Sequence, residues 1–293
     1  MKVEPECAAC ILSRGTSEAI AATTNPAFRF RVMSELLKLL TKEFRPSAVP
    51  ADLGTKRHRI VKRITGNNDP YKRNKRISNE KALKILPYAR KLVEEGYAQQ
   101  DRFKKACMCA IVGNVMEFDI PGHRFTFGSL RKSVREAAKD LVIDDVGKIY
   151  ELAKKAHEVL YLTDNAGEIV LDTLLVEQLK SMGLAVTVAV KGGPVLNDAT
   201  LEDVEVSGIG KIADKIITTG TDAVGLVPNE VSSDFLSAYN ATDVVFAKGM
   251  GYAETLTEFK LKKPHALLFR TKCNPVANFF GVAKEKNVAK LML

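Results

Sequence analysis

Two adjacent polar side chains, Asp164 and Asn165, stand between an apolar run and an amphipathic one. Residues 159–163 predict a buried strand and residues 169–183 predict a helix, so the pair is expected at a strand-to-helix turn. Carboxylate and amide oxygens suit Mg²⁺ or Mn²⁺ better than they suit thiol-binding metals. Taken alone, the pair slightly favours a helix N-cap, which needs only one of the two residues.

The elements that would position this pair alternate between strand and helix over residues 151–293. The candidate strands are residues 159–163, 185–190, 215–219, 243–247 and 265–269. They are apolar along most of their length, as strands covered on both faces are. The pattern predicts an α/β fold with a doubly wound, mostly parallel, Rossmann-like sheet.

Each candidate strand ends in a polar or glycine-rich turn, and right-handed crossovers would bring all these turns to one edge of the sheet. The polar residues of the turns are Asp164, Asn165, Lys191, Asn197, Asp198, Asp222, Lys248, Glu254, Arg270 and Lys272. Carboxylates can hold a divalent cation, whereas lysines and the backbone at Gly192 and Gly249 can hold phosphate oxygens. Helix capping explains each residue separately but not three lysines at strand ends. We therefore expect metal-assisted chemistry on a small phosphorylated metabolite.

The first half of the chain has helical periodicity and no alternating strands. The expected helices cover residues 10–23, 26–44, 56–65, 78–96, 100–118 and 127–141. We therefore expect a helical cap domain over residues 1–150 and an α/β domain over residues 151–293. Asn114 is a candidate substrate contact, because it follows a glycine and could project into the cleft between the two domains.

Composition excludes several classes of protein. The chain has 293 residues, 46% of them hydrophobic and 27% charged, with no apolar run long enough for a membrane span. The N-terminus has no apolar signal region, and an odd number of cysteines does not suggest a secreted disulfide framework, so a cytoplasmic protein without a membrane partner is expected. A homo-oligomer is left open.

The formal net charge of +9 is concentrated in residues 56–76, which contain nine Lys or Arg and one Asp. We interpret this segment first as a solvated helical face and second as a surface that attracts small anionic substrates. Nucleic-acid binding ranks third, because the segment contains one aromatic residue and no zinc-finger spacing.

Several motifs in order along the chain resemble the metal-dependent damage-control phosphatase family, long catalogued as a domain of unknown function. The motifs are Cys7-Ala-Ala-Cys10, Asp69-Pro70-Tyr71, Gly113-Asn114, LTDNAGE, KGGPVLNDAT, GTDAVG, KGMGYAE and RTKCNPVA. The N-terminal cysteines resemble the branch that includes archaeal proteins. The resemblance implies a helical N-terminal domain packed on a Rossmann-like domain.

The resemblance also implies a divalent metal, Mg, Mn, Co or Ni, held by Asp164, Asn165 and Asp198, with Lys272 facing the substrate phosphate. Family members hydrolyse phosphate esters of sugars, damaged metabolites or phosphopantetheine-type compounds. The segment from Arg270 to Cys273 has one residue fewer between Thr and Lys than the sugar-phosphate branch. This difference weakens the inference that the chain shares the specificity of that branch for hexose phosphates.

The expected activity is that of a metal-dependent phosphomonoesterase. Lys272 would neutralise phosphate charge, with Asp222 or Glu254 as general acid or base. The remaining expected substrate contacts are Asn114, Lys191, Gly192, Lys248, Gly249 and Arg270. A water activated by the metal is preferred as the attacking group, because the sequence lacks a DxDx(T/V) run; a carboxylate nucleophile stays open.

Two functions of other classes compete with the phosphatase. One is a basic nucleic-acid-binding protein that uses residues 56–76. The other is a Rossmann-type carboxyl methyltransferase, which the absence of a glycine-rich loop after the first candidate strand disfavours.

Three thiols form a separate hypothesis. Cys7, Cys10 and Cys273 would cluster near the site if the helical half folds back over the edge of the sheet, as a soft-metal or redox element. Ordinary packing of small apolar side chains is about as good an explanation.

Overall fold

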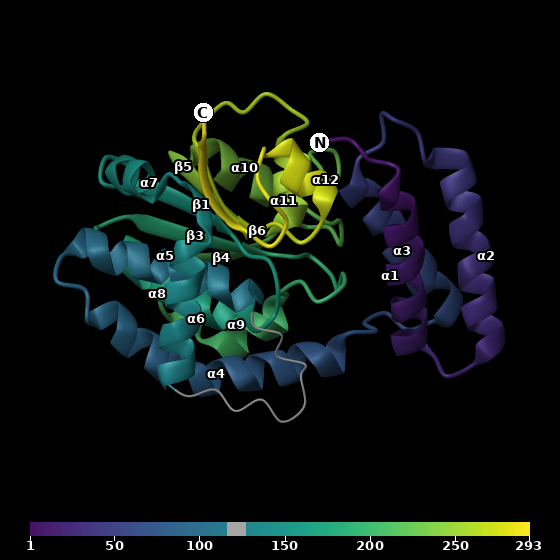
Figure 1. The fold of residues 1–293 in the computed structure, drawn as a ribbon, viewed down its shortest axis with the longest axis horizontal. Coiled ribbons are helices and arrows are strands. Elements are labelled where there is room, and N and C mark those ends of the chain that lie inside the picture. The colour runs from purple at the N-terminus through teal and green to yellow at the C-terminus, as the bar shows by residue number, and fades with distance from the viewer. Residues whose placement is uncertain (116–126) are drawn as a thin grey trace.

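The computed structural model describes the backbone of residues 1–115 and 127–293, and their side chains except those of residues 114, 115, 127–131 and 133. A seven-stranded sheet runs through the molecule in the order β1-β7-β6-β5-β2-β3-β4 (Figure 1). The strands are β1 (Leu141–Asp144), β2 (Glu158–Leu162), β3 (Ala185–Val190), β4 (Lys215–Thr218), β5 (Val244–Lys248), β6 (His265–Arg270) and β7 (Asn287–Met292). Only β7 against β6 pairs antiparallel in this sheet of described residues.

Helices cover both faces of the sheet, as expected for a doubly wound fold. One face is covered by α4 (Lys72–Glu94), α5 (Gln99–Val115), α6 (Phe127–Lys139), α7 (Val146–Ala153), α8 (Glu168–Ser181) and α9 (Leu201–Ser207), followed by the 3-10 turn η1 (Ile209–Lys211). The other face is covered by α10 (Ser233–Ala241), α11 (Met250–Leu256) and α12 (Asn274–Phe279). β2 shows the resulting alternation, because Val159 and Tyr161 join the first core while Leu160 and Leu162 join the second.

The first three helices form a third layer with a small core of its own. They are α1 (Glu6–Ala22), α2 (Pro26–Glu43) and α3 (Pro50–Thr65), and their shared core includes Val32, Leu36 and Val61. They lie to the right of the sheet in Figure 1. None of the helices in the described residues is both long and apolar enough to cross a bilayer.

The prediction of a doubly wound, mostly parallel α/β fold is confirmed, and all five predicted strands are present as β2 to β6. The N-terminal half differs from the expectation of helix alone, because β1 pairs with β7 in the sheet. Helices α4, α5 and α6 also pack on the sheet and not with α1–α3. The division into domains at residue 150 stays a prediction. Among the described residues of the first 150, α1–α3 form the layer that lies apart from the sheet.

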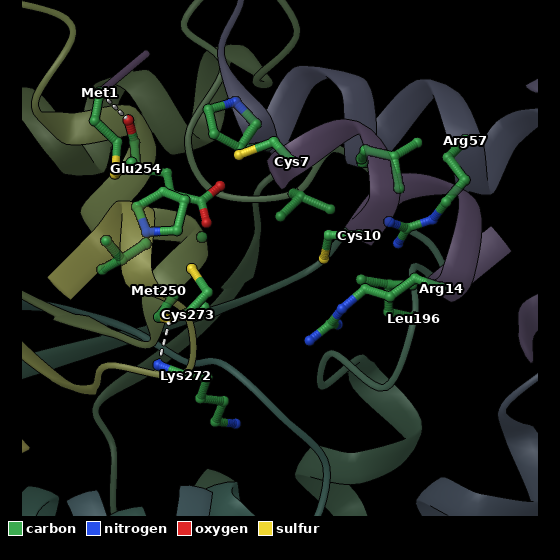
Figure 2. Close-up of a pocket in the computed structure, with 18 of the residues that line it drawn as sticks. Met1, Cys7, Cys10, Arg14, Arg57, Leu196, Met250, Glu254, Lys272 and Cys273 are labelled. Carbon is green, nitrogen blue, oxygen red and sulfur yellow. Dashed lines mark hydrogen bonds between the residues drawn. The ribbon is translucent and has the colours of Figure 1, made fainter. Parts of the chain in front are cut away.

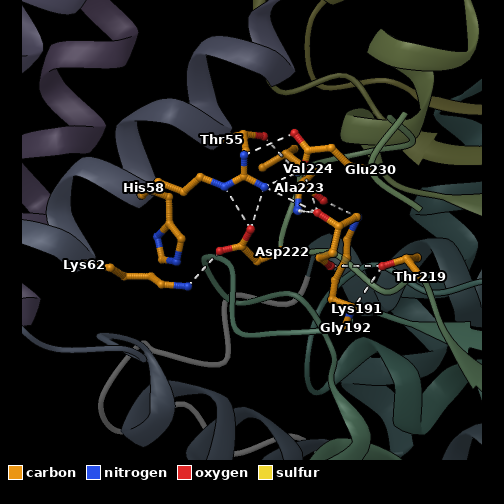
Figure 3. A network of polar contacts seen from close by, with 12 residues as sticks. Thr55, His58, Lys62, Lys191, Gly192, Thr219, Asp222, Ala223, Val224 and Glu230 are labelled. Atoms are coloured by element: carbon orange, nitrogen blue, oxygen red, sulfur yellow. Dashed lines mark hydrogen bonds and ion pairs between the residues drawn. The ribbon is translucent and has the colours of Figure 1, made fainter. Parts of the chain in front are cut away.

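Helix α3 attaches this layer to the turns at the carboxyl ends of β3 and β4 (Figure 3). The Arg59 guanidinium contacts Asp222 Oδ1 at 2.7 Å, and Lys62 Nζ donates to Asp222 Oδ2 at 2.8 Å. His58 Nε2 lies 3.2 Å from the Pro194 carbonyl oxygen, and the Thr55 hydroxyl accepts from the Val224 N–H at 2.9 Å. The α1–α3 layer is therefore held at the carboxyl edge of the parallel strands.

These contacts correct in part the interpretation of residues 56–76 as mainly a solvated surface. His58 is buried and Arg59 and Lys62 bind the α/β layers, while Lys75 is buried in an ion pair with Asp69 at 2.8 Å. Five of the nine Lys and Arg residues of the segment are exposed, and these agree with a solvated surface: Lys56, Arg63, Lys72, Arg73 and Arg76.

Candidate active site

The candidate metal ligands meet because two turns are joined by backbone hydrogen bonds. Strand β2 lies between β3 and β5. From β2 the sheet continues with β3 and β4 on one side and with β5 and β6 on the other, and ligands bind at such a reversal of strand order in open α/β sheets. The Ala199 N–H donates to the Asp164 carbonyl at 2.7 Å, and the Ala166 N–H donates to the Asn197 carbonyl at 2.8 Å. Asn165 and Asp198 form an isolated antiparallel bridge, so the predicted set of Asp164, Asn165 and Asp198 is brought together.

The side chain of Asn165 is oriented by its two acidic neighbours. Its Nδ2 donates to Asp164 Oδ2 at 2.9 Å and to Glu168 Oε2 at 3.2 Å. Both amide hydrogens are used this way, so the amide oxygen Oδ1 is the polar atom of this side chain that these carboxylates do not engage, and Asn165 lines the cavity. An amide held in this orientation presents an oxygen ligand to a cation.

Gly249, at the end of β5, explains how Asp164 fits beside the next strand. A β-carbon on residue 249 would lie 2.0 Å from Asp164 Oδ2, and its backbone has φ +84°, which favours glycine. Gly249 therefore lies at the predicted site, where its lack of a side chain leaves room for the Asp164 carboxylate.

A cavity of about 560 Å³ opens over these residues, between the strand ends and α1 (Figure 2). Its floor includes Asp164, Asn165, Asp198, Glu254 and Lys272, and its wall includes Cys7, Cys10, Arg14 and Arg57 from the α1–α3 layer. The volume lies within the range of ordinary metabolite pockets. Two of the three predicted catalytic residues, Lys272 and Glu254, therefore share one cavity with the predicted ligands.

Like charges meet at the floor of this cavity. Burial, with the carboxylates of Glu168 and Asp198, raises the pKa of Asp164, and the Lys272 ammonium opposes that rise. Burial also raises the pKa of Asp198 to about 6, against the effect of Lys191. Buried carboxylates that repel one another favour a cation between them.

The donor set of two carboxylates and an amide oxygen fits a hard divalent cation such as Mg²⁺ or Mn²⁺. Among the residues that the structure describes, no three His, Cys, Asp or Glu side chains are placed to hold a metal ion together. That finding agrees with a set in which one of the three protein ligands is an amide.

Lys248 is placed differently from the prediction that it contacts the substrate. It is fully buried beneath the site, where Nζ contacts Glu168 Oε1 and Asp172 Oδ1 and donates to the Ala110 carbonyl. Burial opposes its charge, but the carboxylates of Asp172 and Glu168 raise the pKa of Lys248. Its charge is neutralised internally, and through Glu168 it supports the orientation of Asn165.

Lys191 is also directed inwards and away from a substrate. Its buried Nζ donates to the carbonyls of Ala223 and Gly225, both at 2.8 Å, and lies 3.7 Å from Asp198 Oδ2. Its ammonium also lies 4.7 Å from the centre of the Tyr252 ring. Lys191 therefore ties together the turns after β3 and β4 and adds positive charge near Asp198.

The other predicted residues lie outside this cavity or outside the described side chains. Asp222 and Gly192 line a smaller depression beside Lys62, and the Asp222 carboxylate is already occupied by Arg59 and Lys62. Arg270 donates to Asn287 Oδ1 at 3.1 Å and does not line the cavity. The Asn114 side chain is outside the part that the structure describes.

Burial sets the ionisation of Glu254. Its carboxyl lines the cavity, and burial raises its pKa to about 7. A carboxyl group that is half protonated near neutral pH can donate a proton to a leaving group, which a fully ionised Asp or Glu cannot do.

The three thiols lie on the same cavity, and Figure 2 shows the sulfur atoms of Cys7, Cys10 and Cys273 facing one space. Burial raises the pKa of both Cys7 and Cys273, and the negative charge of Glu254 also acts to raise both pKa values. Their proximity satisfies the condition on which the thiol hypothesis depended. Their role stays a prediction.

Sequence reasoning missed three contributors to the site. Asn79 Oδ1 accepts the Gly167 N–H at 2.6 Å and so fixes the turn after β2 from α4. Glu168 orients Asn165, and Arg14 lines the cavity wall. Arg14 follows Cys7 by seven residues and Cys10 by four, a helical spacing that could have indicated one shared face.

Comparison with known proteins gives the same family along the whole chain. The model of the damage-control phosphatase ARMT1-like domain matches residues 3–288. A damage-control phosphatase of Archaeoglobus fulgidus is 37% identical over 293 residues, which cover 100% of both chains. Damage-control phosphatase PH1575 of Pyrococcus horikoshii is 36% identical over 286 residues, covering 97% of this chain and 96% of that protein.

The fold of this chain is also similar to that of a solved structure. The crystal structure of the DUF89 family protein PH1575 from Pyrococcus horikoshii superposes with a TM-score of 0.87 at 35% identity, and the match covers 99% of this chain and 98% of that one. The family was predicted from motifs along the chain, and several of these motifs lie at the strand ends that build the cavity. The chain belongs to the damage-control phosphatase family.

Proposed function

We propose that this protein is a metal-dependent phosphomonoesterase that hydrolyses small phosphorylated metabolites at the cavity over Asp164, Asn165 and Asp198. The names of its relatives support a phosphatase. The observation that carries the proposal is the meeting of two carboxylates and an amide with Lys272, in a cavity of metabolite size.

Asp164, Asn165 and Asp198 would hold the divalent cation. When bound, the cation supplies positive charge to the phosphoryl oxygens and lowers the pKa of a water molecule. Phosphoryl transfer needs mainly positioning and charge stabilisation, so few other groups are required.

The chain's own residues supply the rest. Among the described residues, Lys272 Nζ has no ion pair, and its backbone N–H donates to Met250 Sδ, which fixes the start of the turn after β6. Its ammonium can therefore bind a phosphoryl oxygen. Glu254, with its raised pKa, would protonate the leaving alkoxide. Asp222 is not assigned this role, because Arg59 and Lys62 lower its pKa against the effect of burial.

The test is phosphate release from a panel of phosphate esters of sugars, sugar acids, polyols and pantetheine with Mg²⁺, Mn²⁺, Co²⁺ or Ni²⁺. We expect turnover with at least one metal, loss of turnover with EDTA and its return when the metal is restored. Turnover that is unaffected by EDTA would contradict the metal, and no phosphate release from any ester would contradict the phosphatase. Nothing in the geometry favours methyl transfer, and the use of α3 charges in internal contacts disfavours a nucleic-acid surface.

A further inference from the structure

Three cations line the cavity without an anionic partner among the side chains that the structure describes: Arg14, Lys272 and Lys284. The next arginine of the same wall behaves differently. Arg57 is buried, and its Nε and Nη2 contact the two carboxylate oxygens of Glu18 at 3.1 Å and 3.3 Å. Arg57 is therefore a structural link between α1 and α3, whereas Arg14 is exposed to the cavity.

Arg14 belongs to the face of α1 that forms the cavity wall. Cys7, Cys10, Ile11 and Arg14 all line the cavity, at the spacing of one helical face. Figure 2 shows the guanidinium of Arg14 and the ammonium of Lys272 both extending into the space between α1 and the strand ends. The two cations thus come from opposite sides of one cavity.

The two cations act on different parts of the cavity. The Lys272 ammonium affects the pKa of Asp164, one of the candidate metal ligands. The Arg14 charge instead affects the pKa of Glu254 and of Cys273. Because Lys272 comes from the turn after β6, beside the candidate ligands, and Arg14 comes from the α1 wall, Lys272 is placed for the phosphoryl group and Arg14 for the part of the molecule beyond it.

The acidic residues of the wall do not cancel Arg14. Glu6 lies eight residues before Arg14 on α1, which is about 12 Å along a helix, and its carboxylate accepts from Asn274 Nδ2 at 3.5 Å. Burial raises the pKa of Glu254 to about 7, which weakens the negative charge that it places near Arg14. The wall around Arg14 therefore keeps a positive charge that a substrate can use.

We infer that Arg14 binds a second anionic group, a carboxylate or a second phosphate, on the organic part of the phosphomonoester. The inference rests on the proposed function and specifies its substrate class as phosphorylated acids. A guanidinium binds carboxylate and phosphate through two parallel hydrogen bonds, so this position selects acids over neutral esters of the same size.

The experiment compares matched pairs that differ in one terminal group. Suitable pairs are glycerol phosphate with phosphoglycerate, erythritol phosphate with phosphoerythronate, and ribitol phosphate with phosphoribonate, and bisphosphates of the same polyols distinguish a second phosphate from a carboxylate. In the wild type we expect kcat/KM to be at least about tenfold higher for the acidic member of the best pair. Arg14→Gln should lower that ratio by about tenfold or more, as expected when a charge-assisted contact is removed.

Two further variants serve as controls. Arg14→Lys keeps the charge without the planar fork and should retain part of the preference. Arg31→Gln removes an equal charge from an exposed position on α2, outside the cavity, and should leave the ratio as in the wild type.

Two results would overturn the inference. One is an equal kcat/KM for both members of every pair in the wild type. The other is an equal loss for both members in Arg14→Gln, which would place Arg14 on the phosphoryl group itself. If no ester releases phosphate, the proposed function fails, and calorimetric titration of wild type and Arg14→Gln with the same pairs still tests Arg14: a matching loss of affinity for the acids alone supports it, and equal affinities contradict it.

Discussion

Two clusters of charged side chains lie along the same edge of the sheet, and they differ in how their charges are used. Around Asp222, every charge has an opposite partner, since Arg59 contacts both Asp222 and Glu230 and Lys62 contacts Asp222 (Figure 3). Around Asp164, the carboxylates gather near one another, and Lys272 and Arg14 face the cavity without ion pairs among the described residues. The first arrangement attaches a layer, and the second is suited to a ligand.

The comparison shows that the number of charges at a strand end does not identify an active site. Charged side chains that are paired with one another inside the protein do not need a ligand to balance their charge. Carboxylates whose pKa values are raised by burial and by one another are unfavourable until a cation or substrate arrives. The difference between the clusters can be tested by changing one residue in each.

The largest effect is expected at the candidate metal ligands. Asp164→Asn and Asp198→Asn should each lower metal-dependent turnover on the order of 10³-fold, because each removes a ligand and the charge that holds the cation. Phosphate release measured with Mn²⁺ checks this. The fold should persist in both variants.

A melting curve without metal provides the control for Asp198→Asn. The folded-state pKa of Asp198 is raised to about 6, so its carboxylate destabilises the fold above that pH and the penalty is relieved as pH falls towards 4. The variant should therefore melt higher than the metal-free wild type at pH 7, by a margin that shrinks at pH 5. Normal activity together with the normal Mn²⁺-induced rise in melting temperature would show that Asp198 is not a ligand.

The next effect concerns Glu254 and depends on the leaving group. Glu254→Gln should lower kcat/KM by on the order of 10²-fold for alkyl phosphates, since their alkoxide leaves only when protonated. Nitrophenyl phosphate has a good leaving group and should lose much less. In the wild type, activity on alkyl esters should fall as the pH rises above about 7, the pKa of Glu254, and the variant should lack this decline.

An equal loss on both classes of ester would contradict a role in proton transfer. Such a result would leave Glu254 as a packing residue of the cavity wall, with its raised pKa a result of burial alone.

The smallest effect on turnover is expected at Asp222. Asp222→Ala leaves Arg59 and Lys62 without their shared carboxylate, so the free energy of unfolding should fall by about 1 to 3 kcal/mol. Turnover of the folded enzyme should change by less than about threefold. Denaturant unfolding measures the stability and steady-state kinetics measures the turnover. A collapse of turnover without loss of stability would show that Asp222 takes part in catalysis.

The sequence allowed the strands and the ligand turns to be predicted because both are local patterns. The apolar runs that became β2, β3, β5 and β6 are buried along most of their length, and β4 was predicted from its apolar residues although it is partly exposed. β1 alternates between partly exposed and exposed positions and the second half of β7 is partly exposed, and both strands were missed. Asp164 and Asn165 follow the end of β2, Asp198 lies in the turn after β3, and neighbouring parallel strands bring such turns together.

The roles of the lysines were not predictable, because they depend on distant partners. Lys248 ends β5 and was expected to face the phosphate, but Glu168 and Asp172 of α8 draw it beneath the site. The helical pattern of α8 does not reveal that its carboxylates point under the sheet edge. Asp222 similarly could not be separated from the site without knowing that α3 lies against it.

The cavity has a floor from the strand ends and a wall from α1, and these two parts of the chain are more than a hundred residues apart in sequence. Bond cleavage and substrate choice can therefore change independently during evolution. Under the proposed function, positions 7, 10 and 14 of the α1 wall are where a designed change of substrate specificity should begin.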